Sequence, residues 1–485
     1  MNQHPGKHVV VVGAGLAGLA AAEAVVRGSA GHAGGIRVTL VEASGRVGGI
    51  LATERRDGWL VERSADSFLA ARPEAVDLVE RLGMSAELIG VDPRVRRALV
   101  LHAGRPQPVP AGFRLLAAGR MDSIMTTPLL SPWGRLRLLG ERLVPRRPAA
   151  GGDESLEHFA IRRLGREAFE RLVQPLAAGI WTADPARLSM AAACPEFFAM
   201  ELQSGSLWAG ERRRAKDAAA GGPAAGARYG QFLTVASGMD AIPRRLAEHL
   251  DAHGVQRLTA AVAAVSQRPD QSWEVRLRAA ADVPAALDAD AVIMALPAPA
   301  AALAVRGGHP SLAQELAAIE YAGSAIVSLG FAREGVSHPL DAAGLVVPRC
   351  ERRRILAVSF SSAKFPGRAP AGSVLLRTFV GGALDPATAA LDDARLLDVV
   401  RAELRDLLGI SGEPQLVQID RWPTAMPQYT VGHVERVARI QGLVAERHGL
   451  ALAGAAYAGV GIPQVIASGQ AAAATAIASL QTRPV

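Results

Sequence analysis

The sequence predicts an α/β protein (α+β overall) organised around a parallel sheet, and the N-terminus carries the evidence. Residues 8–12 form an apolar strand, 13–18 form a glycine-rich turn, and an alanine-rich helix runs to about residue 27. A second strand follows at 37–41. A strand, a glycine turn, a helix and a second strand in this order make the first βαβ unit of a doubly wound sheet.

The glycine turn has the spacing of a site for the ADP part of a dinucleotide. Gly13 allows the tight turn, Gly15 lets the backbone approach a pyrophosphate, and Gly18 lets helix and strand pack closely. The N–H groups at the helix start hold the pyrophosphate charge. Glu42 ends the second strand, so it can accept both ribose hydroxyls and disfavours the additional phosphate of NADP. The contacts predicted here are Gly13, Ala14, Gly15, Leu16, Ala17, Gly18, Glu42 and Ala43.

The residues after Glu42 indicate which dinucleotide binds. They place a cation, Arg46, and a second glycine pair, Gly48-Gly49, directly behind the second strand, which suits a longer and more enclosed ligand. This stretch resembles the second motif of the superfamily of FAD-dependent amine oxidases, desaturases and porphyrinogen oxidases. The resemblance implies FAD as the cofactor, with Arg46 at its phosphates and Gly48 and Gly49 passing close to it.

The composition limits the size, the metal content and the compartment. The chain has 485 residues, 49% of them hydrophobic, which is enough for a large core and two to four domains. Cys194 and Cys350 are too few for a disulfide framework and too far apart in sequence for a metal cluster, so we predict no metal and a reducing cytoplasm. We find no signal peptide and no 18-residue segment that is continuously apolar without glycine turns.

The charge balance is basic, with 53 Lys and Arg against 46 Asp and Glu. Two explanations stay open: arginine usage in a GC-rich genome, or attraction to anionic lipid or carboxylated substrates. Only 4% of the residues are aromatic and we recognise no nucleic-acid module, so we expect no nucleic-acid partner.

Periodicity predicts the elements of the first half of the chain. A short strand and turn at 59–68 precede a helix over 72–83 and a strand at 97–102. Residues 112–215 look helical, and segments 113–116 and 133–143 place leucines on one face and arginines on the other. Such a face suits a membrane surface, and it equally suits a solvated helix packed on its own domain.

Further signals mark helix ends and a loop. Ser155 is a predicted N-cap, the helix that carries Phe169 runs up to Pro175, and the segment 211–228 is predicted to be a mobile loop. The later strands are predicted at 232–235, 255–258, 262–265, 273–277, 290–297, 326–329, 345–347, 355–360, 374–380 and 450–454, and the later helices after 238, at 392–408 and at 464–480. The strand at 290–297 resembles the one that closes the nucleotide-binding sheet of these flavoproteins.

These elements suggest three domains. A Rossmann-like FAD-binding domain combines 1–95, 225–300 and 435–485. A β-rich substrate-binding domain, formed by 96–112 and 301–434, and an α-helical domain, 113–224, are inserted into it, and the helical domain is the candidate for contact with a membrane.

Four stretches narrow the resemblance within the superfamily. They are 171–189, 194–207, which opens with Cys194-Pro195, 422–433, which contains Pro427-Gln428-Tyr429, and 453–469. Together they resemble the protoporphyrinogen and coproporphyrinogen III oxidases over nearly the whole chain. The resemblance implies a cytoplasmic enzyme of haem synthesis, peripheral at the inner face of the membrane if it associates with one. FAD accepts hydride, dioxygen reoxidises the flavin to give H2O2, and three rounds convert a porphyrinogen to a porphyrin.

The resemblance also implies roles for single residues. Because the flavin accepts the hydride, no protein side chain is assigned as catalytic. The substrate-binding positions are Arg97 for a propionate, with Arg96 as the competing alignment, Gly179 for the pyrrole nitrogens, and Val346 and Phe379 on the two faces of the macrocycle. The remaining flavin contacts are Val262, Trp422, Gly454, Gly459, Val460, Gly461 and Ile462. Ferrochelatase and a second copy of the chain are the expected protein partners.

One departure and several alternatives remain. Ser64-Ala65 stands where the family that the chain resembles has Gly-Pro, in a turn that runs by the flavin, so we expect FAD to bind and assign no flavin contacts to 63–66. A related amine oxidase or carotenoid desaturase is the first alternative, although only Lys7, Lys216 and Lys364 could supply the lysine-linked water that amine oxidases commonly use. A non-catalytic porphyrin carrier is the second alternative. The sequence does not decide between coproporphyrinogen III and protoporphyrinogen IX.

Overall fold

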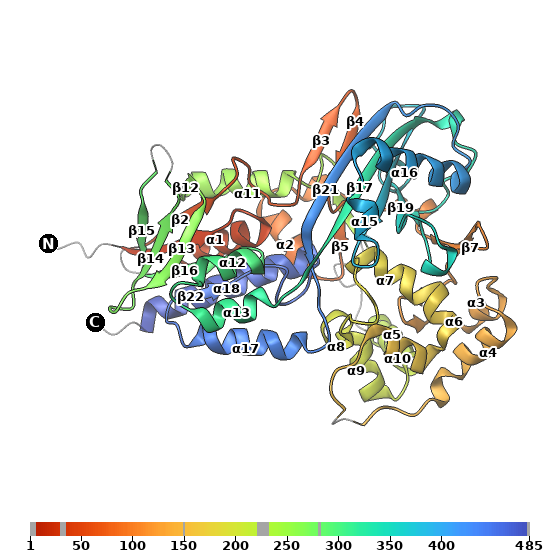
Figure 1. Cartoon of the computed structure of the whole chain (residues 1–485), viewed down its shortest axis with the longest axis horizontal. Coiled ribbons are helices and arrows are strands. Elements are labelled where there is room, and N and C mark those ends of the chain that lie inside the picture. Colours follow the sequence, from red (N-terminus) through yellow and green to blue (C-terminus); the bar gives the residue numbers. More distant parts are fainter. Residues whose placement is uncertain (1–5, 30–34, 149–150, 221–231, 280–282, 483–485) are drawn as a thin grey trace.

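The computed structural model of the chain describes residues 6–29, 35–148, 151–220, 232–279 and 283–482. Figure 1 shows three regions: a parallel sheet with its helices on the left, a second sheet at the upper right, and a group of helices at the lower right. No helix within these described ranges is long and apolar enough to cross a membrane. The three-domain division stays a prediction.

The left-hand region is built on a five-stranded parallel sheet in the order β12-β2-β1-β16-β22. Its strands are β1 (Lys7–Val12), β2 (Ile36–Glu42), β12 (Gln256–Thr259), β16 (Ala291–Met294) and β22 (Leu450–Leu452). The chain leaves β1 toward β2 on one side and returns as β16 on the other, which makes the gap between β1 and β16 the topological switch point. The prediction that the strand at 290–297 closes this sheet is wrong, because β22 pairs with its outer side.

Alternate residues of β1 supply the cores on the two faces of this sheet. Val9 and Val11 pack with α1 (Leu16–Gly28), α2 (Pro73–Arg81), α11 (Ala241–Ala252) and α18 (Ile462–Thr482). Val10 and Val12 pack on the opposite face. That face is covered by β13 (Val262–Gln267), β14 (Trp273–Leu277), β15 (Ala286–Ala289), α12 (Ala298–Val305), α13 (Pro310–Ala317) and α17 (His433–Ala445).

The second sheet has seven strands in the order β21-β17-β20-β19-β18-β7-β8. They are β7 (Ala98–His102), β8 (Arg105–Pro108), β17 (Tyr321–Ala332), β18 (Gly344–Val346), β19 (Ala357–Phe360), β20 (Ser373–Gly381) and β21 (Leu416–Pro427). The apolar side of α16 (Asp393–Leu408) covers one face, where it packs on Val327 and Leu329. The other face is turned toward the hairpin of β3 (Thr53–Arg56) and β4 (Trp59–Glu62), whose Trp59 packs on Leu375.

Short elements link these sheets. β5 (Phe68–Leu69) and β6 (Leu88–Gly90) pair with β11 (Phe232–Val235) in a three-stranded sheet. The short helices α14 (Ser361–Lys364) and α15 (Pro386–Ala389) flank β20.

The lower-right region is helical and has its own core around Phe159, Leu172 and Phe197. Its elements are α3 (Met121–Thr126), α4 (Pro132–Leu139), α5 (Leu156–Leu164), α6 (Arg166–Ala168), the π-helical turn η5 (Phe169–Val173), α7 (Gln174–Trp181), α8 (Met190–Ala193), α9 (Pro195–Ser204) and α10 (Leu207–Ala220). The cap at Ser155 is confirmed, since its hydroxyl accepts from the N–H of His158 at 3.2 Å.

Three predictions in this region are wrong. Residues 113–118 form a hairpin of β9 (Phe113–Arg114) and β10 (Ala117–Ala118), because Leu115 takes a left-handed backbone conformation with φ of 42°. The helix does not end at Pro175 but continues to Trp181. Proline is tolerated there because the preceding π-helical turn already breaks the regular α-helical hydrogen bonds, so the missing proline N–H costs little. Residues 211–220 are helical, held by an ion pair of Arg214 with Glu211 at 2.6 Å, while 221–228 lie outside the described residues.

We expect Gly469→Ala to destabilise the protein. A Cβ at Gly469 would lie 2.3 Å from the Ala17 carbonyl oxygen, so α18 would have to move away from α1. The expected loss is about 1–3 kcal/mol in the free energy of unfolding, measured by chemical denaturation. Gly442→Ala is the control, because a Cβ on this glycine of α17 would meet no atom of another element within 4 Å, and the change should leave the stability equal or higher. Equal stability of Gly469→Ala and wild type would contradict the close packing.

Candidate functional site

At the carboxyl ends of β1 and β16, the backbone segments lie so close together that Gly13 and Gly18 could not carry a side chain. Gly13 has a φ of 100°, and a Cβ there would lie 2.6 Å from the carbonyl oxygen of Ala295 at the end of β16. A Cβ on Gly18 would lie 1.9 Å from the Gly13 carbonyl oxygen. Gly15 caps α1 without a side chain, and the first turn of α1 holds no acidic residue. Backbone N–H groups therefore line a place where an anionic ligand can approach closely.

Glu42 fixes the geometry of this turn. Its carboxylate accepts from the N–H of Ala14 at 2.7 Å through one oxygen and from the N–H of Ser44 at 2.8 Å through the other. A carboxylate has about four acceptor positions, so capacity remains for ribose hydroxyls. Ala43 is exposed beside it. Ala260, two residues before Val262, donates its N–H to the Glu42 carbonyl oxygen at 2.8 Å, which places Val262 on the same side of the sheet edge.

The second glycine pair lies directly against the first turn. The N–H of Gly48 donates to the Ala14 carbonyl oxygen at 2.8 Å, and a Cβ on Gly49 would lie 3.2 Å from Cα of Gly15. Arg46 is exposed and donates to the backbone carbonyls of Gly49 and Leu51, so its guanidinium braces the loop 46–51. The two glycine motifs thus form one cradle.

The segment 453–461 between β22 and α18, which we call the C-terminal turn, reaches the same carboxyl edge of the parallel sheet. Gly454 follows β22 and its N–H donates to the Ser468 hydroxyl at 2.9 Å, while a Cβ on Gly454 would lie 4.0 Å from the carbonyl oxygen of Leu296. The N–H of Gly459 donates to the Tyr429 hydroxyl at 2.9 Å. Gly461 directly precedes α18, whose first residue is the buried Ile462.

Three of the predicted substrate residues come together on the second sheet. The register aligns Val346 with Ala357, Ala357 with Phe379, and Phe379 with Ile326, so these side chains form a row across one face. Gly179 of α7 lies over this row, because a Cβ there would be 4.0 Å from Cγ1 of Val346. We call the set Val346, Ala357 and Phe379 the apolar wall.

Arg97 directly precedes β7, next to the edge strand β8 of the seven-stranded sheet. Its side chain is 51% exposed, and it pairs with Asp341 through the carboxylate and through the backbone carbonyl, the latter at 3.1 Å. Arg96 is exposed in the preceding turn. The structure therefore places Arg97 at the rim, apart from the row of Val346 and Phe379.

The cradle and the apolar wall meet at the helical core. Val346 of the wall and Val460 of the C-terminal turn both pack against the helical core that contains Leu172. Tyr429, whose hydroxyl accepts from Gly459, is buried in that same core. The apolar wall and the C-terminal turn of the cradle, which come from distant parts of the chain, thus border the same helical core.

Buried charge beside the apolar wall was missed by the sequence analysis. Arg377 of β20 is 1% exposed, and its guanidinium lies 3.2 Å from the Asp66 carboxylate. Lys364 donates to the same carboxylate at 2.9 Å. Trp422 lies nearby on β21 and donates its indole N–H to the Arg63 carbonyl oxygen at 2.8 Å. The signal in the sequence was a single charged residue in a strand that is otherwise uncharged and mostly apolar, Val-Leu-Leu-Arg377-Thr-Phe-Val.

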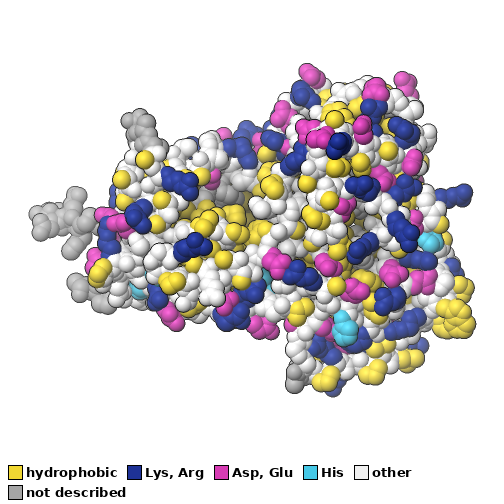
Figure 2. Space-filling view, in the orientation of Figure 1, with side chains coloured by type: hydrophobic (Ala, Val, Ile, Leu, Met, Phe, Trp, Pro, Cys, Tyr) yellow, Lys and Arg dark blue, Asp and Glu magenta, His cyan; other side chains and the backbone are white. Residues whose placement is uncertain are grey.

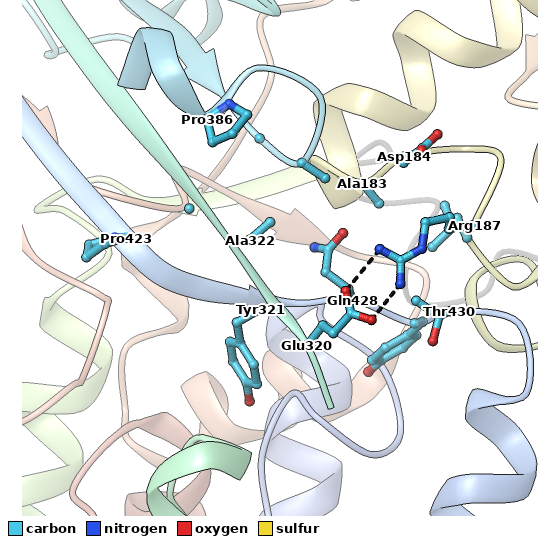
Figure 3. A pocket seen from close by; sticks show the side chains of 15 residues that line it. Ala183, Asp184, Arg187, Glu320, Tyr321, Ala322, Pro386, Pro423, Gln428 and Thr430 are labelled. Carbon is cyan, nitrogen blue, oxygen red and sulfur yellow. Dashed lines mark hydrogen bonds and ion pairs between the residues drawn. The ribbon is translucent and has the colours of Figure 1, made fainter. Parts of the chain in front are cut away.

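A half-open cavity of about 340 Å³ lies between the helical region and the ends of β17 and β21. Figure 3 shows the ion pair of Arg187 with Glu320 at its rim, and Tyr321, Gln428 and Thr430 around it. It is lined by Ala183, Asp184, Arg187, Leu188, Glu320, Tyr321, Ala322, Gly323, Gly382, Ala383, Pro386, Pro423, Gln428, Tyr429 and Thr430, a set without any predicted substrate residue.

Comparison with known proteins identifies the class of this chain. The model of the flavin containing amine oxidoreductases matches residues 16–477, so the chain belongs to that family. It is an oxidoreductase and its cofactor is FAD. Cyclohexylamine oxidase from Brevibacterium oxydans IH-35A shares the fold with a TM-score of 0.69 at 15% identity, over 98% of this chain and 100% of that one.

Within that family the chain belongs to the coproporphyrinogen III and protoporphyrinogen oxidases. It is 36% identical to the coproporphyrinogen III oxidase of Propionibacterium freudenreichii subsp. freudenreichii, over 95% of this chain and 88% of the relative. It is 32% identical to the coproporphyrinogen III oxidase of Bacillus subtilis (strain 168), over 98% of both chains. A crystal structure of a protein from Exiguobacterium sp. 255-15 superposes with a TM-score of 0.83 at 29% identity, over 98% of this chain and 99% of that one.

We expect Glu42→Ala to weaken FAD binding about 10- to 100-fold, because a hydrogen bond to a charged group contributes about 1.5–3 kcal/mol. The Ala14 N–H would also lose its acceptor. The dissociation constant is measured from the recovery of FAD fluorescence on dilution. Asp77→Ala, which removes an exposed carboxylate of α2, is the control and should bind FAD as wild type does. An unchanged constant in Glu42→Ala would remove Glu42 from the cofactor site.

Proposed function

We propose that the protein oxidises a porphyrinogen, coproporphyrinogen III or protoporphyrinogen IX, to the porphyrin in haem biosynthesis. The observation that carries the proposal is the apolar wall of Val346, Ala357 and Phe379 at the region where the FAD cradle ends. The names of the full-length relatives support the same substrate class. Each porphyrinogen would consume three dioxygen molecules and release three of H2O2.

The residues of the chain would bind and orient the two reactants. The glycine cradle and Glu42 would hold the ADP part of FAD, and the C-terminal turn at Gly459 would hold the flavin end. The bound flavin supplies the hydride acceptor. The apolar wall would pack on one side of the macrocycle, so Val346 and Phe379, which share one face of the sheet, would contact the same side of it and not its two faces. Gly179, which has no side chain, would leave space for the macrocycle and turn its carbonyl to the pyrrole N–H groups. Arg97 would pair with a propionate in place of Asp341.

Oxygen uptake by the purified holoprotein tests this proposal. With each porphyrinogen in turn, we expect uptake of three dioxygen molecules for each porphyrin formed, and catalase should return half of the oxygen. Uptake with amines and with neither porphyrinogen would favour the amine oxidase alternative. Tight porphyrin binding without any uptake would favour the carrier alternative.

Variants of the two competing arginines complete this test. Arg97→Ala should raise KM for the porphyrinogen about tenfold, the loss of about 1.4 kcal/mol, with kcat nearly unchanged, because a propionate is bound equally in ground and transition states. Arg96→Ala tests the competing alignment. Arg94→Ala, an exposed arginine one turn earlier, is the matched control and should leave both constants unchanged.

We also propose that the helical region rests on an anionic membrane. Trp133 of α4 is 79% exposed and Leu143 is 80% exposed, and Met125 and Leu136 are exposed beside them. We call these four side chains the apolar patch. Figure 2 shows hydrophobic side chains at the lower right, over the position of α3 and α4 in Figure 1. Exposed Arg142 and Arg146 adjoin the patch and supply the positive charge that anionic lipid attracts. Dioxygen as acceptor, ferrochelatase as partner and a homodimer remain predictions.

We expect the triple variant Trp133→Ser, Leu136→Ser, Leu143→Ser to lose at least about tenfold in partition onto phosphatidylglycerol vesicles, because each buried large apolar side chain contributes about 1.5–3 kcal/mol. Cosedimentation measures the partition. The matched control replaces three exposed apolar residues elsewhere, Leu303, Val431 and Val434, with serine. Equal binding by both triple variants would contradict the role of the apolar patch.

A further inference from the structure

Arg377 is a buried arginine in a strand whose other residues are uncharged. It lies in β20 between Leu376 and Thr378, which are both buried, and it is 1% exposed itself. Since side chains alternate along a strand, Arg377 shares its face with Phe379 of the apolar wall. The face opposite, with Leu376, belongs to the core under α16.

One end of the guanidinium holds the turn 63–66. It donates to the Ser64 carbonyl oxygen and lies 3.2 Å from the Asp66 carboxylate. Burial raises the pKa of Asp66, but the nearby Lys364 ammonium and the Arg377 guanidinium outweigh it and hold the pKa well below its usual range. The Arg377–Asp66 contact is therefore an ion pair, and the planar fork of arginine reaches the carbonyl and the carboxylate together.

The same turn is fastened to the second glycine motif. The Ser64 hydroxyl donates to the Ile50 carbonyl oxygen at 2.6 Å, and the N–H of Arg63 donates to the Ala52 carbonyl oxygen at 2.8 Å. A glycine at this position could not make the contact of the Ser64 hydroxyl with Ile50. A movement of the turn is thus transmitted to the loop that carries Gly48 and Gly49.

The guanidinium also contacts the apolar wall. Its central carbon lies 5.4 Å from the ring centroid of Phe379, within the range of a cation–π contact. Arg377 is consequently in contact both with the turn that is tied to the FAD cradle and with the side chain proposed to face the macrocycle. Stability alone does not require this group, because a well-packed apolar residue often replaces a buried ion pair without loss.

We propose that Arg377 is a positioning residue that sets the position of the apolar wall relative to the bound cofactor. The inference rests on the proposed function, since it assumes that Phe379 faces a porphyrinogen. It assigns one role to Arg377, Asp66 and Ser64: their contacts lock the cradle loop and the apolar wall into one unit. A displacement of about 1 Å between reacting groups lowers a rate about 100-fold, so the lock acts on the rate of hydride transfer.

The test compares Arg377→Lys with wild type in anaerobic stopped-flow mixing with coproporphyrinogen III. Lysine keeps the charge beside Asp66 but has no fork to hold the Ser64 carbonyl as well. We expect the rate constant of flavin reduction to fall at least tenfold and the visible circular dichroism of the flavin to change. The rate of reoxidation by dioxygen and KM should each stay within about threefold. An unchanged reduction rate and an unchanged flavin spectrum would overturn the proposal.

Arg368→Lys is the matched control. Arg368 is also buried, and it donates to the Val235 and Ala236 carbonyl oxygens. It also pairs at 3.7 Å with Glu62, the residue before the turn 63–66, so the control tests a buried arginine that lies beside the turn and does not hold its carbonyl or Asp66. An equal fall in both variants would show a merely structural role and would overturn the proposal. If Arg377→Lys does not fold, the double variant Asp66→Asn, Arg377→Met, which removes both charges, takes its place with the same expected results. If porphyrinogen fails to reduce wild-type flavin, the proposed function is wrong, and the spectrum of the bound flavin alone then decides whether Arg377 positions it.

Discussion

The structure depends on the close approach of backbone to backbone at the switch point between β1 and β16. Gly13 faces the Ala295 carbonyl, Gly18 faces the Gly13 carbonyl, and Gly469 brings α18 against Ala17 of α1. Any side chain at these positions would separate the strand, the first helix and the last helix. Because Gly13 and Gly18 lie near the start of the chain and Gly469 lies near its end, the first and last segments of the chain form the cofactor cradle only together.

The second sheet adds the other half of the site because its two faces differ. One face packs on α16, and the other carries the apolar wall and Arg377 toward the turn 63–66. The helical core then joins the two halves, since Val346 and Val460 both pack against it. In this arrangement the cofactor cradle determines where oxidation can occur, and the wall determines which molecule lies there.

Periodic sequence patterns predicted the elements whose structure depends mainly on neighbouring residues. The βαβ unit around Gly13 and the helix at Asp393–Leu408 follow from strand and helix periods, and they are confirmed. β21 was missed because polar residues and Pro423 break its pattern, and it is held by pairing with β17. The hairpin at Phe113–Ala118 depends on the left-handed Leu115, which a branched side chain disfavours. The substrate roles of Gly179, Val346 and Phe379 were predicted from the family resemblance alone. No local pattern could show that Val346 and Phe379 are neighbours, because only the strand register aligns them. The Arg377–Asp66 pair spans a long separation in sequence, so the single arginine in its strand could be noticed but its partner could not be predicted.

The most direct test of the account is an anaerobic titration of the holoprotein with porphyrinogen, followed at the flavin absorption band. Removal of six electrons from each porphyrinogen, two for each flavin, predicts complete bleaching at one third of an equivalent, with the porphyrin Soret band rising in proportion. Full retention of oxidised flavin after addition of an excess of either porphyrinogen would contradict the claim that the FAD cradle and the apolar wall form one oxidising site.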